Sequence, residues 1–239
     1  MNKTSISVLV PAYNEELLIR ETITELVQYL RTLSLDSFEV IICVNGSSDS
    51  TEQISKQLSE ELEKVKYFST KERGFGFALN EGIKKANKEM ITFIPGDGEI
   101  VLDFKGESIK LMENYDFISG SRYIDEKSSG SNKLRKFLGW VFASSFRILF
   151  DSGLTEVGTV KVFKTKWAKT VLEKLTEKNY AWQIQAIYNA LHDGLRVTET
   201  PVKARIKRDP SHSKVRIFSD GISMLVVCLK YGLKFRLHI

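Results

Sequence analysis

Short β-branched runs alternate with amphipathic helical segments through the first 94 residues, and this order restricts the chain to few folds. Strands are predicted where buried-type apolar runs end at a breaker or a turn: 5–10, 38–44, 65–68 and 90–94. Helices are predicted between them, over 15–33, 51–62 and 75–87. Strands separated by long helices form βαβ units, so the sequence predicts an α/β fold with a mainly parallel sheet flanked by helices.

The loops that follow these strands give the first indication of function. They are rich in glycine, proline, asparagine or acidic residues and cover 11–15, 45–49, 69–76 and 95–99. In open parallel sheets, ligands bind beyond the carboxyl ends of the strands. We therefore expect one ligand site to be formed by these loops.

The second half of the chain is less regular. Further strands are predicted at 116–120, 195–200 and 202–206, and helices at 182–191 and 215–237. The segment 134–150 is strongly apolar, and the segment before it is polar and rich in glycine and serine. We expect 134–150 to be a helix that lies either in a membrane interface or in the protein core or a dimer contact.

Composition excludes several classes of protein. The 239 residues are 42% hydrophobic and 27% charged, as in ordinary globular proteins, and suffice for one large domain or one domain with an appendage. The two cysteines, Cys43 and Cys228, lie in apolar runs, which favours buried thiols over a disulfide. The sequence has no uninterrupted apolar run of membrane-spanning length and no signal-peptide pattern at its start, so we expect a cytoplasmic protein.

Positive charge is concentrated at the end of the sequence. The net charge is +5, and the segment 203–239 holds nine lysines and arginines against two acidic residues, Asp209 and Asp220. A basic segment on a nearly neutral body indicates an anionic partner, such as a phosphate ligand or a membrane surface. Nucleic acid is disfavoured because the segment contains no recognition motif.

Two carboxylates stand close together in one of the strand-end loops. Asp97 and Glu99 are two residues apart on a segment with glycines at 96 and 98. Both can turn toward one hard cation, and Mg²⁺ or Mn²⁺ bound in this way keeps positions for water and substrate phosphates. Taken alone, the pair is more typical of a solvated acidic turn.

Six stretches in a fixed order relate the sequence to a known family. They are VPAYNE at 10–15, VNGSSDST at 44–51, RGFGFA at 73–78, PGDGE at 95–99, GSRY at 120–123 and RDPSHSK at 208–214. Over about residues 5–214 the chain resembles the family 2 glycosyltransferases of GT-A fold, especially the dolichyl- or polyprenyl-phosphate mannosyl- and glucosyltransferases. The resemblance implies a Rossmann-like nucleotide-diphospho-sugar transferase domain over 1–206, followed by a phosphate-clamp loop and a basic amphipathic helix over 207–239.

The sequence departs from the family pattern at two motifs. Val44 and Asn45 stand where the family has two aspartates, and Asn45 still offers an acceptor and a donor to a base. Pro95 replaces the first aspartate of the DxD metal motif, Asp97 matches the second, and Glu99 stands where related synthases have glutamine. The resemblance implies a non-standard site for Mg²⁺ or Mn²⁺ on Asp97 and Glu99.

The resemblance also implies a role for each matched residue. Asp97, Arg122 and Arg208 are the expected catalytic residues. The donor, a GDP- or UDP-sugar, is expected to be bound by Pro11, Ala12, Tyr13, Glu15, Asn45, Arg73, Gly74, Gly96, Asp97, Arg208 and Lys214. The acceptor is expected to meet Arg122, Asn132, Arg135 and Ser213. A lipid phosphate is already an anionic nucleophile, so an inverting transfer to it needs no general base.

The expected function is inverting transfer of a mannose- or glucose-type sugar to a polyprenyl or dolichyl phosphate. The expected location is the cytoplasmic face of an anionic membrane, to which apolar helices flanked by lysine and arginine would bind peripherally. A homodimer or a membrane-protein partner is compatible with the apolar segments. Two alternatives stay open: a family 2 enzyme acting on a soluble or protein-linked acceptor, and a non-catalytic protein that binds nucleotide sugar or lipid phosphate.

Overall fold

The computed structural model describes residues 4–96, 100–102, 107–121, 142, 144–204 and 217–237, of which 100–102, 107–110, 203–204 and 217–222 are described by their backbone alone. The chain divides into two compact units, each made of two stretches of sequence. Unit 1 comprises Met1–Glu99 and Val162–Asn179, and unit 2 comprises Ile100–Lys161 and Tyr180–Ile239. The domain boundary predicted between residues 206 and 207 stays a prediction, because it lies outside the described residues.

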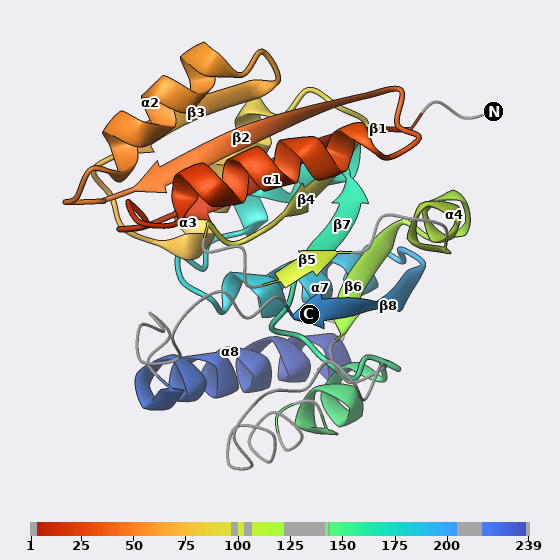
Figure 1. Ribbon diagram of the computed structural model, residues 1–239. Helices are drawn as coiled ribbons and strands as arrows, with labels where there is room; N and C mark the ends of the chain where they lie inside the picture. The colour runs from red at the N-terminus through yellow and green to blue at the C-terminus, as the bar shows by residue number, and fades with distance from the viewer. Residues whose placement is uncertain are drawn as a thin grey trace. The chain divides into compact units, whose positions relative to one another are not determined.

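Unit 1 is built on a mainly parallel sheet (Figure 1). Its strands run in the order β3 (Val65–Thr70), β2 (Ser37–Asn45), β1 (Ser5–Ala12), β4 (Met90–Phe93) and β7 (Lys161–Lys164). The first four are parallel, and β7 pairs antiparallel with β4. β1 is central in this unit, and seven of its eight residues are buried. Its β-branched and apolar side chains therefore form the core that fixes the register of its neighbours.

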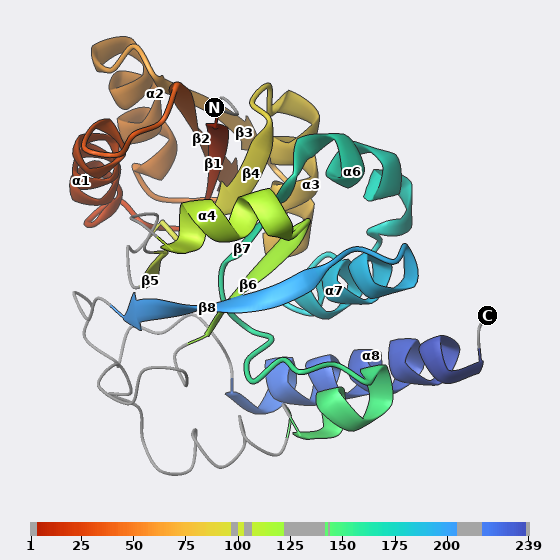
Figure 2. The same ribbon diagram turned by 90° about the vertical axis from the view of Figure 1, so that its right-hand side faces the viewer.

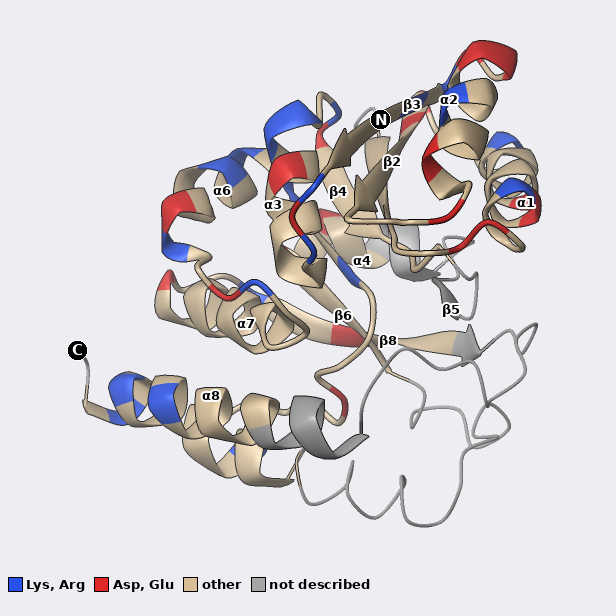
Figure 3. Ribbon diagram, turned by 90° about the vertical axis from the view of Figure 1, so that its left-hand side faces the viewer, with Lys and Arg blue, Asp and Glu red and all other residues tan. Residues whose placement is uncertain are grey.

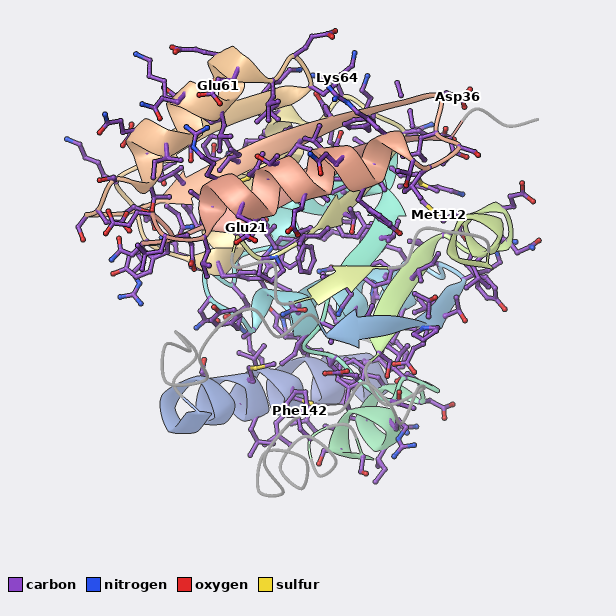
Figure 4. All side chains as sticks on the ribbon, viewed as in Figure 1. Glu21, Asp36, Glu61, Lys64, Met112 and Phe142 are labelled. Carbon is purple, nitrogen blue, oxygen red and sulfur yellow. The ribbon has the colours of Figure 1, made fainter. Side chains whose placement is uncertain are left out.

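Helices cover the sheet of unit 1 and bury one face each. They are α1 (Ile19–Arg31), α2 (Thr51–Glu61), α3 (Phe75–Lys85) and α6 (Thr165–Val171). In α1 the buried residues recur at steps of three and four, which is the spacing of one helix face. α1 and α2 lie side by side, and Arg20 next to Glu61 (labelled in Figure 4) joins their outer surfaces with an Nη1–Oε2 distance of 2.7 Å.

The described residues of unit 2 form three strands and several helices. β8 (Val197–Ala204) pairs parallel with β6 (Phe117–Ser121) and antiparallel with β5 (Ile100–Leu102). The helices are α4 (Glu107–Asn114), α7 (Trp182–His192) and α8 (Ile217–Leu237), and residues 144–150 are also helical. α8 lies alongside α7 (Figure 2).

The predicted α/β class and mainly parallel sheet are confirmed, but one strand prediction is wrong. The two strands predicted at 195–200 and 202–206 are replaced by the single strand β8, which continues through Pro201. The pairing with β6 ends at Pro201, and the pairing with β5 covers 202–204. Proline cannot donate to a ladder, so it is tolerated at this change of partner without ending the strand.

Candidate functional site

The loops after β1 and β2 are joined by hydrogen bonds between side chains and main chain. The main-chain N–H of Asn14 donates to Ser47 Oγ at 3.0 Å, and the main-chain N–H of Ser48 donates to Asn14 Oδ1 at 2.8 Å. Asn14 has a φ of 53°, a left-handed conformation that asparagine tolerates better than most residues. The two loops therefore form one rigid element at the carboxyl ends of the strands.

A second set of hydrogen bonds fixes the residues that follow. The Glu15 N–H donates to Thr51 Oγ1 at 2.7 Å, and the Glu16 N–H donates to Asp49 Oδ2 at 3.2 Å. Asp49 Oδ1 accepts from both the N–H and the hydroxyl of Thr51 at the start of α2. Burial opposes ionisation of Asp49, but these hydrogen bonds lower the pKa of its carboxyl below the ordinary value. Asp49 is therefore a charged group that binds the first residue of α2 and ties this helix to the β1 loop.

Asn45, the last residue of β2, connects three segments of unit 1. Its Nδ2 donates to the carbonyl of Ala12 at 3.0 Å and to that of Cys43 at 3.3 Å, and its Oδ1 accepts from the Gly74 N–H at 3.2 Å. The residue is 4% exposed. Both polar ends of the side chain thus face the main chain, and its predicted contact with a nucleotide base stays a prediction.

Arg73 and Tyr13 meet beside these loops. The Arg73 guanidinium carbon lies 4.1 Å from the centroid of the Tyr13 ring, which is cation–π geometry. Gly46, with a φ of +67°, permits this approach, since a Cβ there would lie 3.2 Å from the Cβ of Arg73 and from the carbonyl of Lys71. Tyr13 and Arg73 are sixty positions apart in the sequence, and the fold brings these two predicted donor residues into contact.

The first N–H groups of α3 are bonded to the main chain near Lys178. The N–H groups of Gly76 and Phe77 donate to the Lys178 carbonyl at 2.9 and 3.3 Å. A Cβ on Gly74 would lie 2.6 Å from the same oxygen, so this close approach requires glycine. A dinucleotide site of the GxGxxG type is disfavoured here. The third glycine of that motif is replaced by Leu79, and the N–H groups of Gly76 and Phe77 already donate to the main chain.

Gly96 places the start of the acidic segment against the β1 loop. Its N–H donates to the Pro11 carbonyl at 3.1 Å, and a Cβ on it would lie 3.2 Å from that oxygen and 3.4 Å from Ala12 Cβ and Glu15 Cγ. Asp97 therefore follows directly from a residue packed on the predicted donor loop. The oxygen donors of Asp97 and Glu99 suit a hard cation such as Mg²⁺ or Mn²⁺. Among the described residues no cluster of three potential metal ligands occurs.

Unit 2 holds the strand that leads into the GSRY motif. Ser121, at the end of β6, has its Oγ 2.8 Å from Thr155 Oγ1, and Glu199 on β8 accepts from the N–H and hydroxyl of Thr155, both at 2.7 Å. Glu199 also accepts from the Glu156 N–H at 2.9 Å. A Cβ on Gly120 would lie 2.6 Å from Val202 Cγ1, so only glycine fits there. These contacts hold the end of β6 immediately before Arg122.

A buried lysine organises the neighbouring loop. Lys161 is fully buried, and its Nζ donates to the carbonyls of Val157 at 2.9 Å and Thr159 at 2.5 Å and to Gln183 Oε1 at 3.3 Å. Thr159 in turn donates its hydroxyl to the Gly120 carbonyl. Sequence reasoning missed Lys161, Thr155 and Glu199; a lysine between Val160 and Val162 in an apolar run was the available signal.

The remaining predicted site residues lie outside the described part of the chain. They are Asp97, Glu99, Arg122, Asn132, Arg135, Arg208, Ser213 and Lys214. The described members, Pro11, Ala12, Tyr13, Glu15, Asn45, Arg73, Gly74 and Gly96, all belong to unit 1. The structure brings these together by direct contacts, and their roles stay predictions.

Comparison with known proteins identifies a family and relatives that match most of the chain. The profile of the family described as glycosyl transferase family 2 matches residues 7–174. The glycosyltransferase AglD of Haloferax volcanii is 25% identical over 92% of this chain, which spans only 35% of AglD. The dolichyl-phosphate β-glucosyltransferase ALG5C of Trichomonas vaginalis is 26% identical over 95% of this chain and 71% of that protein.

Solved structures show the same fold. Glucosyl-3-phosphoglycerate synthase from Mycobacterium tuberculosis, in complex with Mn²⁺, UDP-glucose and phosphoglyceric acid, superimposes with a TM-score of 0.64. The two sequences are 15% identical, and the match covers 97% of this chain and 80% of the synthase. The predicted GT-A fold and the predicted family resemblance are both confirmed.

Proposed function

Because the chain belongs to glycosyl transferase family 2, we propose that it transfers a mannose- or glucose-type sugar from a GDP- or UDP-sugar to a polyprenyl or dolichyl phosphate, with inversion. The observation that carries the donor half of this proposal is the rigid loop element of unit 1. Its Tyr13–Arg73 pair offers an aromatic face and a cation at the carboxyl ends of parallel strands, where ligands of such sheets bind. These groups suit a nucleotide, which has a flat base and an anionic diphosphate.

The sugar leaves its donor as a nucleoside diphosphate, so the reaction needs stabilisation of developing negative charge. Asp97 and Glu99 would hold Mg²⁺ or Mn²⁺, which neutralises the diphosphate when it is bound. Gly96 supports this role because its contact with Pro11 fixes the segment that leads to Asp97. Arg208 and Lys214 supply further positive charge toward the diphosphate, by resemblance to the family.

The acceptor half rests on the residues around the end of β6. Glu199 and Thr155 hold Ser121, which precedes Arg122, and an arginine can pair with an acceptor phosphate through two hydrogen bonds. Asn132, Arg135 and Ser213 complete the proposed acceptor residues. A phosphate oxygen is already anionic, so it attacks the sugar without a side-chain base. The relative ALG5C, named for transfer to dolichyl phosphate, supports a lipid acceptor.

A soluble phosphorylated acceptor is the second candidate. The solved structure of fold-related glucosyl-3-phosphoglycerate synthase contains phosphoglyceric acid, which is a soluble phosphate compound. Both acceptors would present a phosphate to Arg122. Only the lipid acceptor requires the enzyme to bind a membrane. Among the described residues no helix is long and apolar enough to cross a bilayer. By resemblance to the polyprenyl-phosphate transferases, we propose a peripheral enzyme at the cytoplasmic membrane face.

Two measurements test the proposed function. A screen of nucleotide sugars for thermal stabilisation, with and without Mn²⁺, should single out one donor, and a ligand present at about 100 times its Kd adds about 2.7 kcal/mol to the free energy of unfolding. With that donor, transfer should occur to a polyprenyl phosphate and be slower to phosphoglyceric acid. Donor binding without transfer to either acceptor would favour a non-catalytic binding protein.

A further inference from the structure

The outer face of α8 exposes a row of large apolar side chains. Of the described side chains, seven large apolar ones are exposed, and five of these lie on α8: Leu225, Val226, Leu229, Leu233 and Leu237, between 42% and 64% exposed. A sixth, Ile148 in the helical segment 144–150, is 70% exposed. The positions on α8 follow helical spacing, so they form one continuous stripe. We call these six residues the α8 apolar face.

The opposite side of α8 is firmly packed in unit 2. Val227, Cys228 and Tyr231 are buried, and the Gln185 amide donates to Tyr231 Oη at 2.6 Å. A Cβ on Gly232 would lie 2.7 Å from Leu149 Cβ, which shows how closely α8 approaches the 144–150 helix. These contacts fix the rotation of α8 about its axis. The α8 apolar face therefore cannot turn inward to bury itself.

Basic side chains border this face, and the helix contributes no acidic ones there. Lys230, Lys234 and Arg236 are all exposed, and residues 223–237 contain no aspartate or glutamate. Figure 3 shows the corresponding blue segments toward the carboxyl end of α8, with no red on its coloured part. Lys230 and Lys234 lie on the same edge of the stripe, with their Nζ atoms 4.8 and 6.0 Å from the Tyr231 ring centroid. The face is thus apolar in the middle and cationic at its edge.

We propose that the α8 apolar face docks onto the surface of a membrane that contains anionic lipid, with α8 lying in the plane of the interface. An in-plane helix inserts apolar side chains among the lipids while its cations meet anionic headgroups. A second copy of the chain fits less well, because pairing two such faces would bring lysines and arginines together without a carboxylate to compensate. The stripe from 225 to 237 is about 18 Å long and is exposed on one side only. It can therefore lie on the bilayer and cannot cross it.

This inference deepens the proposed function, since it names the surface that would bring the enzyme to a lipid acceptor, and it can be tested separately. The full chain is sedimented with vesicles of phosphatidylcholine, with and without phosphatidylserine, at low and high salt. The variant Leu229→Gln/Leu233→Gln should reduce binding by about tenfold or more, because two inserted side chains become polar. Lys230→Gln should reduce binding to the anionic vesicles by about fivefold and lower its salt dependence.

Leu17→Gln is the matched control. Leu17 belongs to unit 1 and is 85% exposed, so the change makes an exposed apolar side chain polar outside the α8 apolar face and should leave vesicle binding unchanged. Thermal unfolding of every variant checks that the fold persists. Transfer to a short, soluble prenyl phosphate should be retained in the α8 variants.

Three results would overturn the proposal. They are failure of the intact protein to bind anionic vesicles at low salt, equal binding by the leucine variant, or a dimer in solution that the leucine variant dissociates. The last result would assign the face to a second copy. If the intact protein binds anionic vesicles but neither binds a donor nor transfers sugar, the proposed function is refuted and the membrane-docking proposal is retained.

Discussion

Replacing Asn45 by aspartate tests whether this residue positions the donor loops or reads the base. The change keeps the size of the side chain and the acceptor for the Gly74 N–H, but it replaces the amide that donates to Ala12 and Cys43. A carboxylate oxygen would then face two carbonyl oxygens at 3.0 and 3.3 Å in a site that is 4% exposed. Two lost hydrogen bonds and a buried charge should cost about 2–4 kcal/mol at pH 7.

The cost should depend on pH in a definite direction. Burial against carbonyls raises the pKa of the new carboxyl in the folded state above its unfolded value. The folded variant then binds more protons than the unfolded chain, so its stability relative to wild type falls as pH rises through the folded pKa. Below the unfolded value, near pH 4, the protonated acid can donate to Ala12, and most of the deficit should disappear.

Thermal unfolding and donor binding measure the two consequences. At pH 7 the midpoint of unfolding should fall by about 10 °C. Donor affinity should fall by about tenfold, because repulsion from the Ala12 and Cys43 carbonyls displaces the carboxylate that accepts from Gly74, the neighbour of Arg73. The matched control is Asn80→Asp, which removes an amide that donates to the Leu175 carbonyl at 2.6 Å away from the nucleotide loops. It should lower stability and leave donor affinity unchanged. Wild-type stability of the Asn45 variant with altered base preference would refute a positioning role.

Three further predictions concern the proposed metal site, the start of α3 and a buried carboxylate of the sheet. Asp97→Asn should lower transfer by about 10²-fold with Mn²⁺ present, and full activity of this variant in chelator would contradict a metal role. Gly74→Ala should lower the free energy of unfolding by about 1–3 kcal/mol, measured in denaturant, because its Cβ would lie 2.6 Å from the Lys178 carbonyl. Burial opposes ionisation of Glu39, but hydrogen bonds from Lys66, the Asn87 N–H and Ser7 lower the pKa of its carboxyl below 4.5. Its stabilising contribution is therefore present above that pH and is lost as pH falls through the folded value; Glu39→Gln should flatten this acid limb of the unfolding curve.

Much of unit 1 could be predicted because its strands β1, β2 and β4 are buried on both faces. The apolar runs at 5–10 and 38–44 are typical of central parallel strands. The structure extends the first to Ala12 and the second to Ser37 and Asn45. The same logic places the following loops at one edge of the sheet. What sequence could not supply is the direction of a side chain: Asn45 ends β2 at the expected edge of the sheet, but its amide faces the main chain.

The chain after residue 99 was less predictable because its local signals conflict with its tertiary contacts. β7 begins and ends with lysine, so its four residues do not resemble a buried strand, yet Lys161 is satisfied by two carbonyls and a glutamine. Pro201 indicated a strand break, although β8 passes through it where its pairing partner changes. β8 pairs with strands that are distant in the sequence, and Lys161 also donates to Gln183, which lies on α7. The local sequence pattern does not contain these partners.

The most direct test of the proposed function follows labelled sugar from the donor into lipid. The purified full chain is incubated with the nucleotide sugar that stabilises it, Mn²⁺ and a long-chain polyprenyl phosphate in anionic vesicles, and the organic-soluble product is analysed for its anomeric configuration. We expect a polyprenyl-phosphate sugar of inverted configuration, which Asp97→Asn reduces by about 10²-fold. Transfer to phosphoglyceric acid with no lipid-linked product would contradict a lipid acceptor, and a product of retained configuration would contradict direct attack by the phosphate.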